Sequence, residues 1–354
     1  MSPARRRLLQ RIALGALSVG VIAATFLYFL PTVANYRDVW DVVQELSWGW
    51  IAVLAGAAVL NVATFAPPWM VALPGLSFVQ ATVVTQVSTA LSIVVPAGLA
   101  AGMATSFGML RSWGFATRHV TRAVTLTGLW NQFLNLSFPV VAIFLLTVSG
   151  GDAAVLAVAA FVGAAVLGVV VAAFIVVLVS DRLARDVGEL AARLTSWALA
   201  KVRRGPVTWG GPSFERFRSD AGELLRRRWH ALTAASLAGS LSVFLVLVLS
   251  LRALDVPASE VSIVEAFAAW SLVRIVGTIP ITPGGIGVIE LGLTGALIGF
   301  GGGNAGVVAA VLVYRFLTIV PTLLVGLGAA ATWRRHRRTA VDEAPTPDHP
   351  VGTM

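Results

Sequence analysis

Long apolar runs separated by short polar segments recur along the whole chain. A run of about 20 apolar residues predicts a helix that spans a membrane, and about eight such runs are present. The chain is therefore predicted to be an all-α polytopic membrane protein. The predicted spans are Ile12–Leu30, Trp48–Trp69, Phe78–Val95, His119–Val148, Ala153–Val179, Ala231–Leu251, Val261–Ile279 and Ala305–Trp333.

Two further apolar pieces are too short to cross a membrane, and each follows a segment rich in proline and glycine. Leu99–Leu110 follows Pro96-Ala97-Gly98 and is roughly 18 Å long as a helix. The other piece follows Thr282-Pro283-Gly284-Gly285. Non-helical backbone at membrane depth must be buried in protein or line a wet cavity. We therefore expect two re-entrant half-helices, at residues 96–111 and 280–300.

Polar segments divide the chain into five parts. The central polar segment carries eleven of the Lys and Arg residues, together with apolar positions at helical spacing. This pattern predicts amphipathic helices on a membrane surface, with their arginines in contact with anionic lipid headgroups. The parts are a basic tail (1–11), a first membrane half (12–179), a basic insertion (180–230), a second membrane half (231–333) and a polar tail expected to be disordered (334–354).

The distribution of basic residues predicts the orientation of the chain. With the N-terminus inside and both short pieces returning to the side they entered from, 22 of the 26 Lys and Arg residues lie on the inner side. We therefore expect cytoplasmic N- and C-termini in a bacterial inner membrane. The same bias accounts for the net charge of +9, so nucleic acid is not an expected partner. Cysteine is absent and the four histidines fit no metal motif, so we expect no metal and no cofactor.

The two membrane halves share a sequence pattern at a fixed offset of 187 residues. Val95-Pro96-Ala97-Gly98-Leu99 aligns with Thr282-Pro283-Gly284-Gly285-Ile286. Because the first short piece enters from the inside and the second from the outside, we expect an inverted-topology repeat of four spans plus four. Such repeats place a binding site between them at the midplane. Further aligned pairs are Leu110 and Leu297, Gly114 and Gly301, Ala123 and Ala310, and Val124 and Val311.

Three charged residues fall near mid-depth when positions are counted at about 1.5 Å per helical residue: Arg274, Glu290 and Arg315. Their sum is one positive charge, which suits an anion such as a lipid phosphate, because guanidinium groups bind phosphate in a bidentate way. The half-helix start at Pro283, with Gly284 and Gly285, would add amide donors. The alternative is an ion pair that only ties helices together.

The first half offers neutral amides in place of charges. Asn131 and Asn135 share one face of a helix. They either line the same cavity as the charged residues or make interhelical hydrogen bonds, and the second interpretation is the simpler one.

Enzyme motifs are absent from the sequence: it has no G-x-S-x-G, H-E-x-x-H or P-loop pattern. We therefore expect no catalytic residues. A lipid-modifying enzyme would have to use Glu290 as its acid or base, and no second group suggests a reaction.

The segment from Arg274 to Glu290 (RIVGTIPITPGGIGVIE), followed by Tyr314-Arg315, resembles the lysylphosphatidylglycerol synthase transmembrane-region family, also called flippase-like proteins. Val95-Pro96-Ala97-Gly98 with Leu110-Arg111-Ser112-Trp113-Gly114 fits the first-half pattern of that family. The resemblance implies a membrane domain that moves aminoacylated phosphatidylglycerol, or a related lipid, between leaflets. The positions it carries over are Arg274, Pro283, Gly284, Gly285, Glu290 and Arg315.

Two-part members of that family carry an aminoacyl-transfer domain after the membrane part, whereas this chain ends about twenty residues after Trp333. We therefore expect a stand-alone membrane domain without synthase activity. The favoured function is a lipid flippase-like transporter that binds membrane phospholipids at its two buried arginines. The alternatives are a non-transporting scaffold that docks a separate partner enzyme on the insertion, and a lipid-modifying enzyme.

Overall fold

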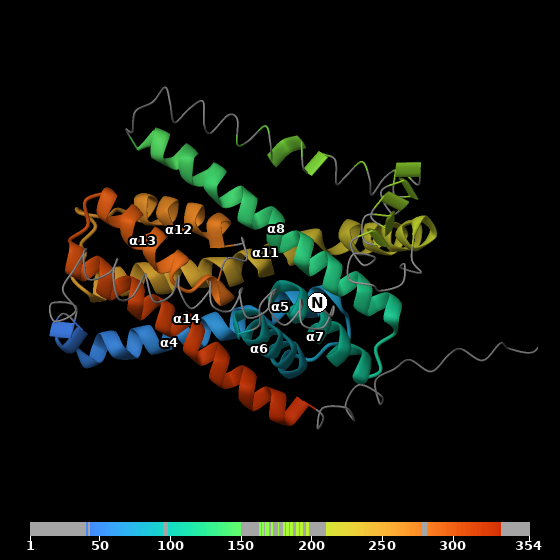
Figure 1. Cartoon of the computed structure of the whole chain (residues 1–354), viewed down its shortest axis with the longest axis horizontal. Coiled ribbons are helices and arrows are strands. Elements are labelled where there is room, and N and C mark those ends of the chain that lie inside the picture. Colours follow the sequence, from blue (N-terminus) through green and yellow to red (C-terminus); the bar gives the residue numbers. More distant parts are fainter. Residues whose placement is uncertain are drawn as a thin grey trace, which may run out of the picture.

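The computed structural model of the chain describes residues 40–41, 43–94, 98–149, 210–277 and 282–333, together with scattered residues between 163 and 197. In these ranges the chain forms nine α-helices with described bounds and no strand (Figure 1). The prediction of an all-α protein is confirmed for this part of the chain.

Within the described ranges, four helical segments are long and apolar enough to cross a membrane. The first joins α4 (Trp48–Thr64) and α5 (Pro67–Ala72), and it bends where Pro67 occupies the first turn of α5. These segments correspond to four of the predicted spans and run roughly along the long axis of the molecule (Figure 1). The other three are α8 (Thr117–Val148), α11 (Gly211–Ala253) and α14 (Asn304–Thr332).

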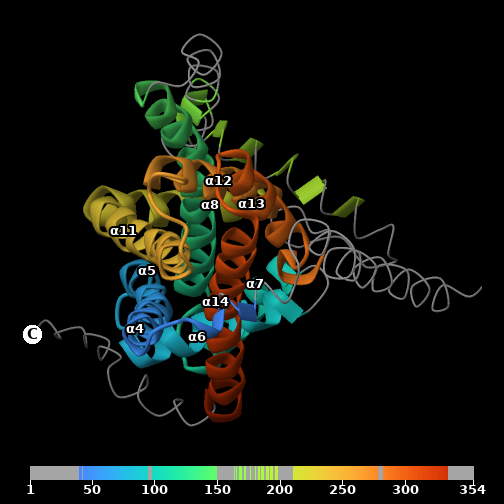
Figure 2. The same ribbon diagram turned by 90° about the vertical axis from the view of Figure 1, so that its left-hand side faces the viewer.

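The third and seventh predicted spans are α6 (Phe78–Val94) and α12 (Ile263–Gly277), with 17 and 15 described residues, and their predicted last residues lie outside the described ranges. α6 packs against α7 (Gly98–Ser112), whereas α12 is followed by the 3₁₀ turn η2 (Pro283–Gly285) and packs against α13 (Val288–Gly299). Each pair is therefore a hairpin of short helices, and both views of the ribbon separate the α6–α7 pair from the α12–α13 pair (Figures 1 and 2).

The helix boundaries in the two halves coincide at the offset found in the sequence. α8 begins at Thr117 and α14 at Asn304, 187 positions later, and in each half the preceding short helix ends five residues earlier. The turns between them contain Gly114 with a φ of +97° and Gly301 with a φ of +114°. Only glycine adopts such angles without strain. The two aligned glycines therefore make the same kind of turn.

α11 runs without interruption from the predicted insertion into the predicted sixth span. It has 43 residues, and no proline occurs between Pro212 and Pro257 to stop it. The part of the predicted insertion from Gly211 onward is thus the first part of a long helix, and its Leu224 and Leu225 pack with Leu126 of α8. The first predicted span lies outside the described residues, and the fifth lies largely outside them.

An aromatic cluster fixes α12 against its neighbours. Phe138 of α8, Phe244 of α11, and Phe267 and Trp270 of α12 have ring centroids 5.2–5.9 Å apart. Trp270 is 1% exposed. Aromatic pairs in such arrangements add about 0.5–1.5 kcal/mol beyond the area they bury. The cluster therefore holds the face of α12 that carries Arg274, one turn after Trp270.

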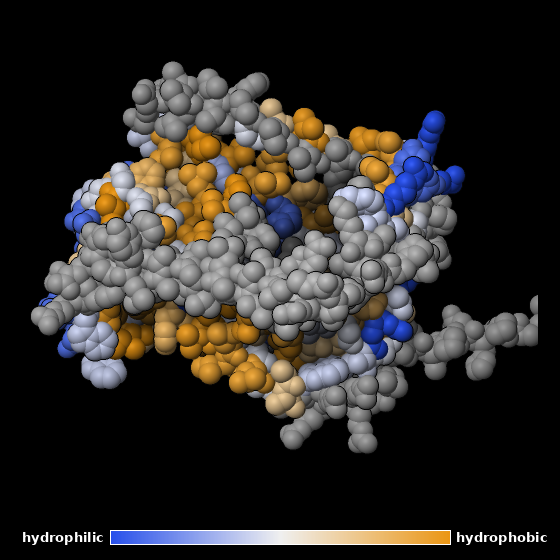
Figure 3. Space-filling model, viewed as in Figure 1, coloured by the Kyte–Doolittle hydropathy of each residue, from blue (hydrophilic) through white to orange (hydrophobic). Residues whose placement is uncertain are grey.

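The outer faces of the long helices are apolar. Val59 of α4, Phe144 of α8 and Leu327 of α14 are 70%, 59% and 73% exposed. Figure 3 shows this apolar surface on one face of the molecule, with hydrophilic atoms deep in a recess. Apolar helices with apolar outer faces are what lipid requires. The chain is a multi-pass membrane protein.

Candidate functional site

Arg315 of α14 and Glu290 of α13 form a buried ion pair. Arg315 Nε donates to Glu290 Oε1 at 2.7 Å, and the two side chains are 11% and 3% exposed. Removing one partner of such a pair leaves an uncompensated buried charge, at a cost of about 3–5 kcal/mol. The pair therefore ties the first turn of α13 firmly to α14.

The break between α12 and α13 supplies further partners for this pair. Arg315 Nη2 donates to the Gly284 carbonyl at 2.9 Å, and the Gly287 N–H donates to Glu290 Oε2 at 2.7 Å. Gly284, Gly285 and Gly287 have φ angles of +62°, +65° and +87°, which other residues adopt only with strain. The glycines thus let the main chain of the break turn its polar groups toward the two charges.

Arg274 of α12 is held by neutral groups. Its Nε and Nη2 both donate to Asn135 Oδ1 of α8, at 3.2 and 2.7 Å. Its guanidinium carbon lies 4.6 Å from the ring centroid of Trp270, within the range of a cation–π interaction. Among the described residues, no carboxylate forms an ion pair with Arg274. An amide dipole and a ring face therefore compensate its charge only in part.

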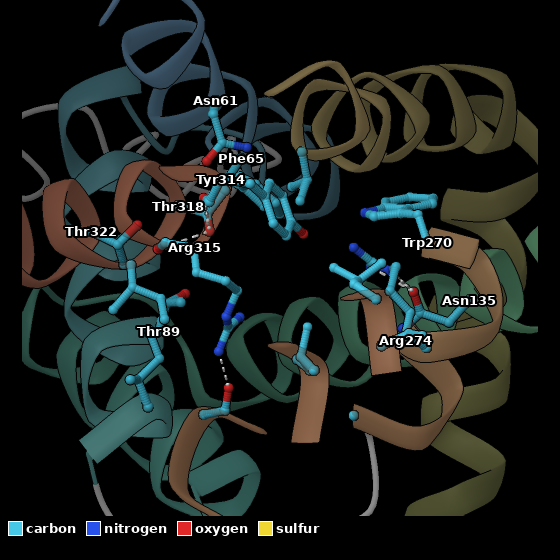
Figure 4. A pocket seen from close by; sticks show the side chains of 18 of the residues that line it. Asn61, Phe65, Thr89, Asn135, Trp270, Arg274, Tyr314, Arg315, Thr318 and Thr322 are labelled. Carbon is cyan, nitrogen blue, oxygen red and sulfur yellow. Dashed lines mark hydrogen bonds between the residues drawn. The ribbon is translucent and has the colours of Figure 1, made fainter. Parts of the chain in front are cut away.

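Both guanidinium groups line one cavity of about 300 Å³, which we call the charged cavity. Figure 4 shows Arg315 and Arg274 on opposite sides of this space, with Tyr314 between them in that view. The two arginines come from α14 and α12, so helices from different parts of the second half meet there. The other polar residues of the wall include Asn61, Thr85, Gln86, Thr89, Asn135, Thr318 and Thr322.

The charged cavity has a net charge of +1. Arg274 and Arg315 contribute two positive charges, and Glu290 removes one. At an effective dielectric constant of 20, a unit negative charge 4 Å from this surplus positive charge would be attracted to it by about 4 kcal/mol. Hydrogen bonds to the described residues use Nε and Nη2 of both arginines. Each guanidinium therefore keeps its Nη1 hydrogens and the second hydrogen of Nη2 as donors for an anion in the cavity.

The structure brings together several of the residues that the sequence singled out. Arg274, Arg315, Gly284 and Asn135 all line the charged cavity. Glu290 is fully buried and acts on the cavity through its bond to Arg315. Of the three charged residues predicted to converge, Glu290 and Arg315 therefore form an ion pair, and Arg274 is separate from it.

The remaining predicted residues lie beside the cavity or in another one. Pro283 begins η2, and Gly285 is buried against Ile289. Asn131 and Asn135 do not share a cavity: Asn135 lines the charged cavity, whereas Asn131 lines a second one. They are one helical turn apart along the axis of α8, and this separation is enough for each to line a different cavity. For Asn135, the interhelical hydrogen bond is what the structure contains.

The sequence analysis missed two residues of the site. Trp270 carries the ring that faces Arg274, and Asn61 of α4 donates to Ser242 Oγ at 3.0 Å beside the cavity. Two signals were present in the sequence. Trp270 precedes Arg274 by four residues, a spacing that places side chains on one helix face, and Asn61 is an amide in an apolar span.

No curated protein matches the sequence significantly. The family model described as the lysylphosphatidylglycerol synthase TM region matches residues 14–326. This match covers both hairpins, both buried arginines and most of the chain. The chain therefore belongs to the lysylphosphatidylglycerol synthase transmembrane-region family.

Proposed function

We propose that this protein moves a lipid with a phosphate-bearing anionic headgroup between the leaflets of a bacterial inner membrane, with both of its termini in the cytoplasm. One observation carries the proposal: a cavity between membrane helices has two arginines at its wall, and one buried carboxylate behind the wall pairs with Arg315. The surplus positive charge and the two Nη1 atoms suit a phosphate, which accepts several hydrogen bonds from guanidinium groups.

In this proposal the two hairpins belong to halves of opposite orientation. The coincident helix boundaries at an offset of 187 support a repeat of two halves, and the distribution of Lys and Arg residues supports their opposite orientation. η2 packs against α6, and a β-carbon on Gly284 would lie 2.9 Å from Ile93 Cγ2. The break of the second half thus meets the end of α6 in the first half, beside the charged cavity. Displacement of either hairpin would change access to the arginines, so we assign both hairpins the role of gates.

Glu290 has a positioning role in this proposal. One carboxylate oxygen accepts from Arg315 and the other from the Gly287 N–H, so both oxygens already have donors. A general acid or base needs an oxygen that can exchange a proton with the substrate. We therefore assign Glu290 to orienting Arg315 and propose no chemical step on the lipid.

The test measures lipid movement between leaflets in proteoliposomes that contain the full-length protein and a fluorescent phosphatidylglycerol. A quencher added outside removes the fluorescence of the outer leaflet, so the fluorescence that remains gives the fraction of the lipid in the inner leaflet. Replacing Arg274 by Gln removes a charge-assisted hydrogen bond of about 1.5–3 kcal/mol, so the rate should fall by roughly ten- to a hundredfold. The control is Arg228→Gln, which removes an equal charge at an exposed position of α11. Equal rates for Arg274→Gln and the control would contradict the proposal.

A further inference from the structure

Arg274 carries the surplus positive charge of the charged cavity. The carboxylate of Glu290 is already paired with Arg315, so no carboxylate of the described residues neutralises Arg274. An arginine keeps its proton in proteins, and a charge in an apolar surrounding is costly without a counter-charge. A negative ion beside Arg274 would remove this cost. The charged cavity therefore favours such an ion even when it holds no lipid.

The amide of Asn135 orients Arg274 but does not neutralise it. Its Oδ1 accepts from Arg274 Nε and Nη2 at 3.2 and 2.7 Å, and its Nδ2 donates to Gln132 Oε1 at 3.3 Å. An amide oxygen has two lone pairs, so Asn135 has no acceptor left for further donors. The guanidinium therefore keeps its remaining hydrogens, on Nη1 and Nη2, for a ligand.

The indole N–H of Trp270 is a second donor without a partner. Trp270 is 1% exposed, and its Nε1 has no hydrogen-bond partner among the described residues. Buried polar groups are nearly always hydrogen-bonded, so an unpartnered one indicates a site for an acceptor. Figure 4 shows the nitrogen end of the indole facing the cavity, toward the hydroxyl of Tyr314. The guanidinium carbon of Arg274 lies 4.6 Å from the ring centroid, so the charge and the N–H are neighbours.

Tyr314 completes this set of donors, which we call the donor corner: Trp270, Arg274 and Tyr314. Tyr314 is 5% exposed, and its ring reaches into the charged cavity from α14 (Figure 4). A phenol hydroxyl rotates about its C–O bond, so it can turn its hydrogen toward a bound ion. An N–H, a charged guanidinium and an O–H from two helices thus border one space, and such donors stabilise an anion.

We propose that the donor corner binds one small monovalent inorganic anion, of the size of chloride, when no lipid is bound, and that a lipid phosphate must displace it. One negative charge neutralises the surplus of the cavity, whereas a divalent ion would leave a negative charge near Glu290. A spherical ion accepts hydrogen bonds from any direction, so it suits three donors of different kinds. The phosphodiester of a lipid also carries one negative charge and can replace the ion. The displacement rests on the proposed function, whereas the anion site does not.

Anion binding is measured first, on the full-length protein in detergent without added lipid. Sodium chloride replaces sodium gluconate at constant ionic strength, so that general screening stays the same. Gluconate is also monovalent, but its polyhydroxylated chain is too bulky for the donor corner. At roughly ten times the Kd of chloride, the unfolding equilibrium shifts about tenfold toward the folded state, which raises the midpoint of thermal unfolding by about 2–4 °C. An unchanged midpoint would overturn the inference.

The variant Arg274→Gln separates an anion site from a purely structural arginine. It should lose the rise in chloride, and in gluconate it should be at least as stable as the unmodified protein, because an uncompensated charge is gone. The control is Arg228→Gln, at an exposed position of α11, which should keep the rise. A rise that survives in Arg274→Gln would overturn the inference, as would an equal loss of stability in both salts.

The variant Trp270→Phe tests the same corner without removing a charge. Phenylalanine keeps an aromatic ring against Phe138 and Phe244 but has no N–H, so the Kd for chloride should rise about three- to tenfold. Trp130→Phe is the matched control, because the Trp130 indole donates to Thr233 Oγ1 at 3.0 Å outside the wall of the charged cavity. Equal Kd values in the two variants would contradict the assignment.

Two further measurements identify the ion and its relation to the lipid. Inorganic phosphate at pH 8, where most of it is divalent, should raise the midpoint less than chloride does; a larger rise would overturn the assignment to a monovalent ion. In the proteoliposome assay, chloride on both sides should slow lipid movement by up to about tenfold at roughly ten times its Kd, because ion and phosphate compete. Equal rates in chloride and gluconate would overturn the displacement. Chloride binding without any lipid movement would refute the proposed function and support the anion site alone.

Discussion

The variant Glu290→Gln tests how the charged cavity is built. The carboxylate accepts two hydrogen bonds at 2.7 Å, from Arg315 Nε and from the Gly287 N–H, at 3% exposure. A glutamine side chain has one acceptor oxygen, so its NH₂ group must face one of these donors. The variant therefore loses the charge and one hydrogen bond together. Leaving a buried charge without its partner costs about 3–5 kcal/mol, which lowers the midpoint of thermal unfolding by on the order of 10 °C.

The assay is thermal unfolding of the purified protein in one detergent, followed by intrinsic fluorescence and by recovery of monodisperse protein. The control is Glu260→Gln, whose carboxylate accepts from the Gly303 N–H at 3.0 Å at an exposed position. That change should cost less than about 1 kcal/mol. The double variant Glu290→Gln/Arg315→Gln should be more stable than the sum of the single losses predicts, because it removes both charges. Strict additivity, or a stable Glu290→Gln protein, would refute the ion pair.

Two glycine positions give further predictions. Gly284→Ala should lower the free energy of unfolding by about 1–3 kcal/mol, because Gly284 has a φ of +62° and its β-carbon would press on Ile93. The control is Gly108→Ala, at an open helical position, and an equal loss of stability in that variant would contradict the prediction. Gly326→Ala should cost about 1–3 kcal/mol, because its β-carbon would lie 2.6 Å from the Gln86 carbonyl oxygen where α14 packs on α6. The matched change Gly328→Ala, with no atom within 4 Å, should be neutral or stabilising in the same unfolding measurement.

Hydrophobic run length predicted the long helices because a membrane imposes a minimum length on every crossing segment. Run length alone does not locate the breaks after α6 and α12, because the residues on both sides of each break are apolar and hydropathy does not register a turn between them. The prolines and glycines near the breaks, by contrast, were visible as residues that disfavour a continuous helix.

The charged members of the site could be predicted from the sequence, but the pairing among them could not. Arg274, Glu290 and Arg315 stand out because charge is rare inside a membrane. Which arginine takes the carboxylate depends on the rotation and packing of four helices. The two partners of Arg315 and Arg274 lie 25 and 139 residues away along the chain. Spacing within one helix holds no information about such contacts.

The charges and the break in the second half depend on each other. A broken helix leaves carbonyl and N–H groups that need partners in an apolar medium, and buried charges need polar partners too. Arg315 and Glu290 meet both needs through Gly284 and Gly287. The first break is satisfied differently, because the Ser92 hydroxyl donates to the Gly98 carbonyl.

This difference gives the two hairpins unequal resistance to movement. A hydrogen bond from a guanidinium contributes about 1.5–3 kcal/mol, and one from a hydroxyl about 0.5–1.5 kcal/mol. Among the hydrogen bonds of the described residues, displacing η2 breaks the bond from Arg315 to the Gly284 carbonyl, whereas displacing the start of α7 breaks a neutral bond from Ser92 to the Gly98 carbonyl. In these hydrogen bonds, the first hairpin therefore resists displacement less than the second. If the two hairpins act as the proposed gates, the first hairpin would move while the arginines of the charged cavity keep their positions.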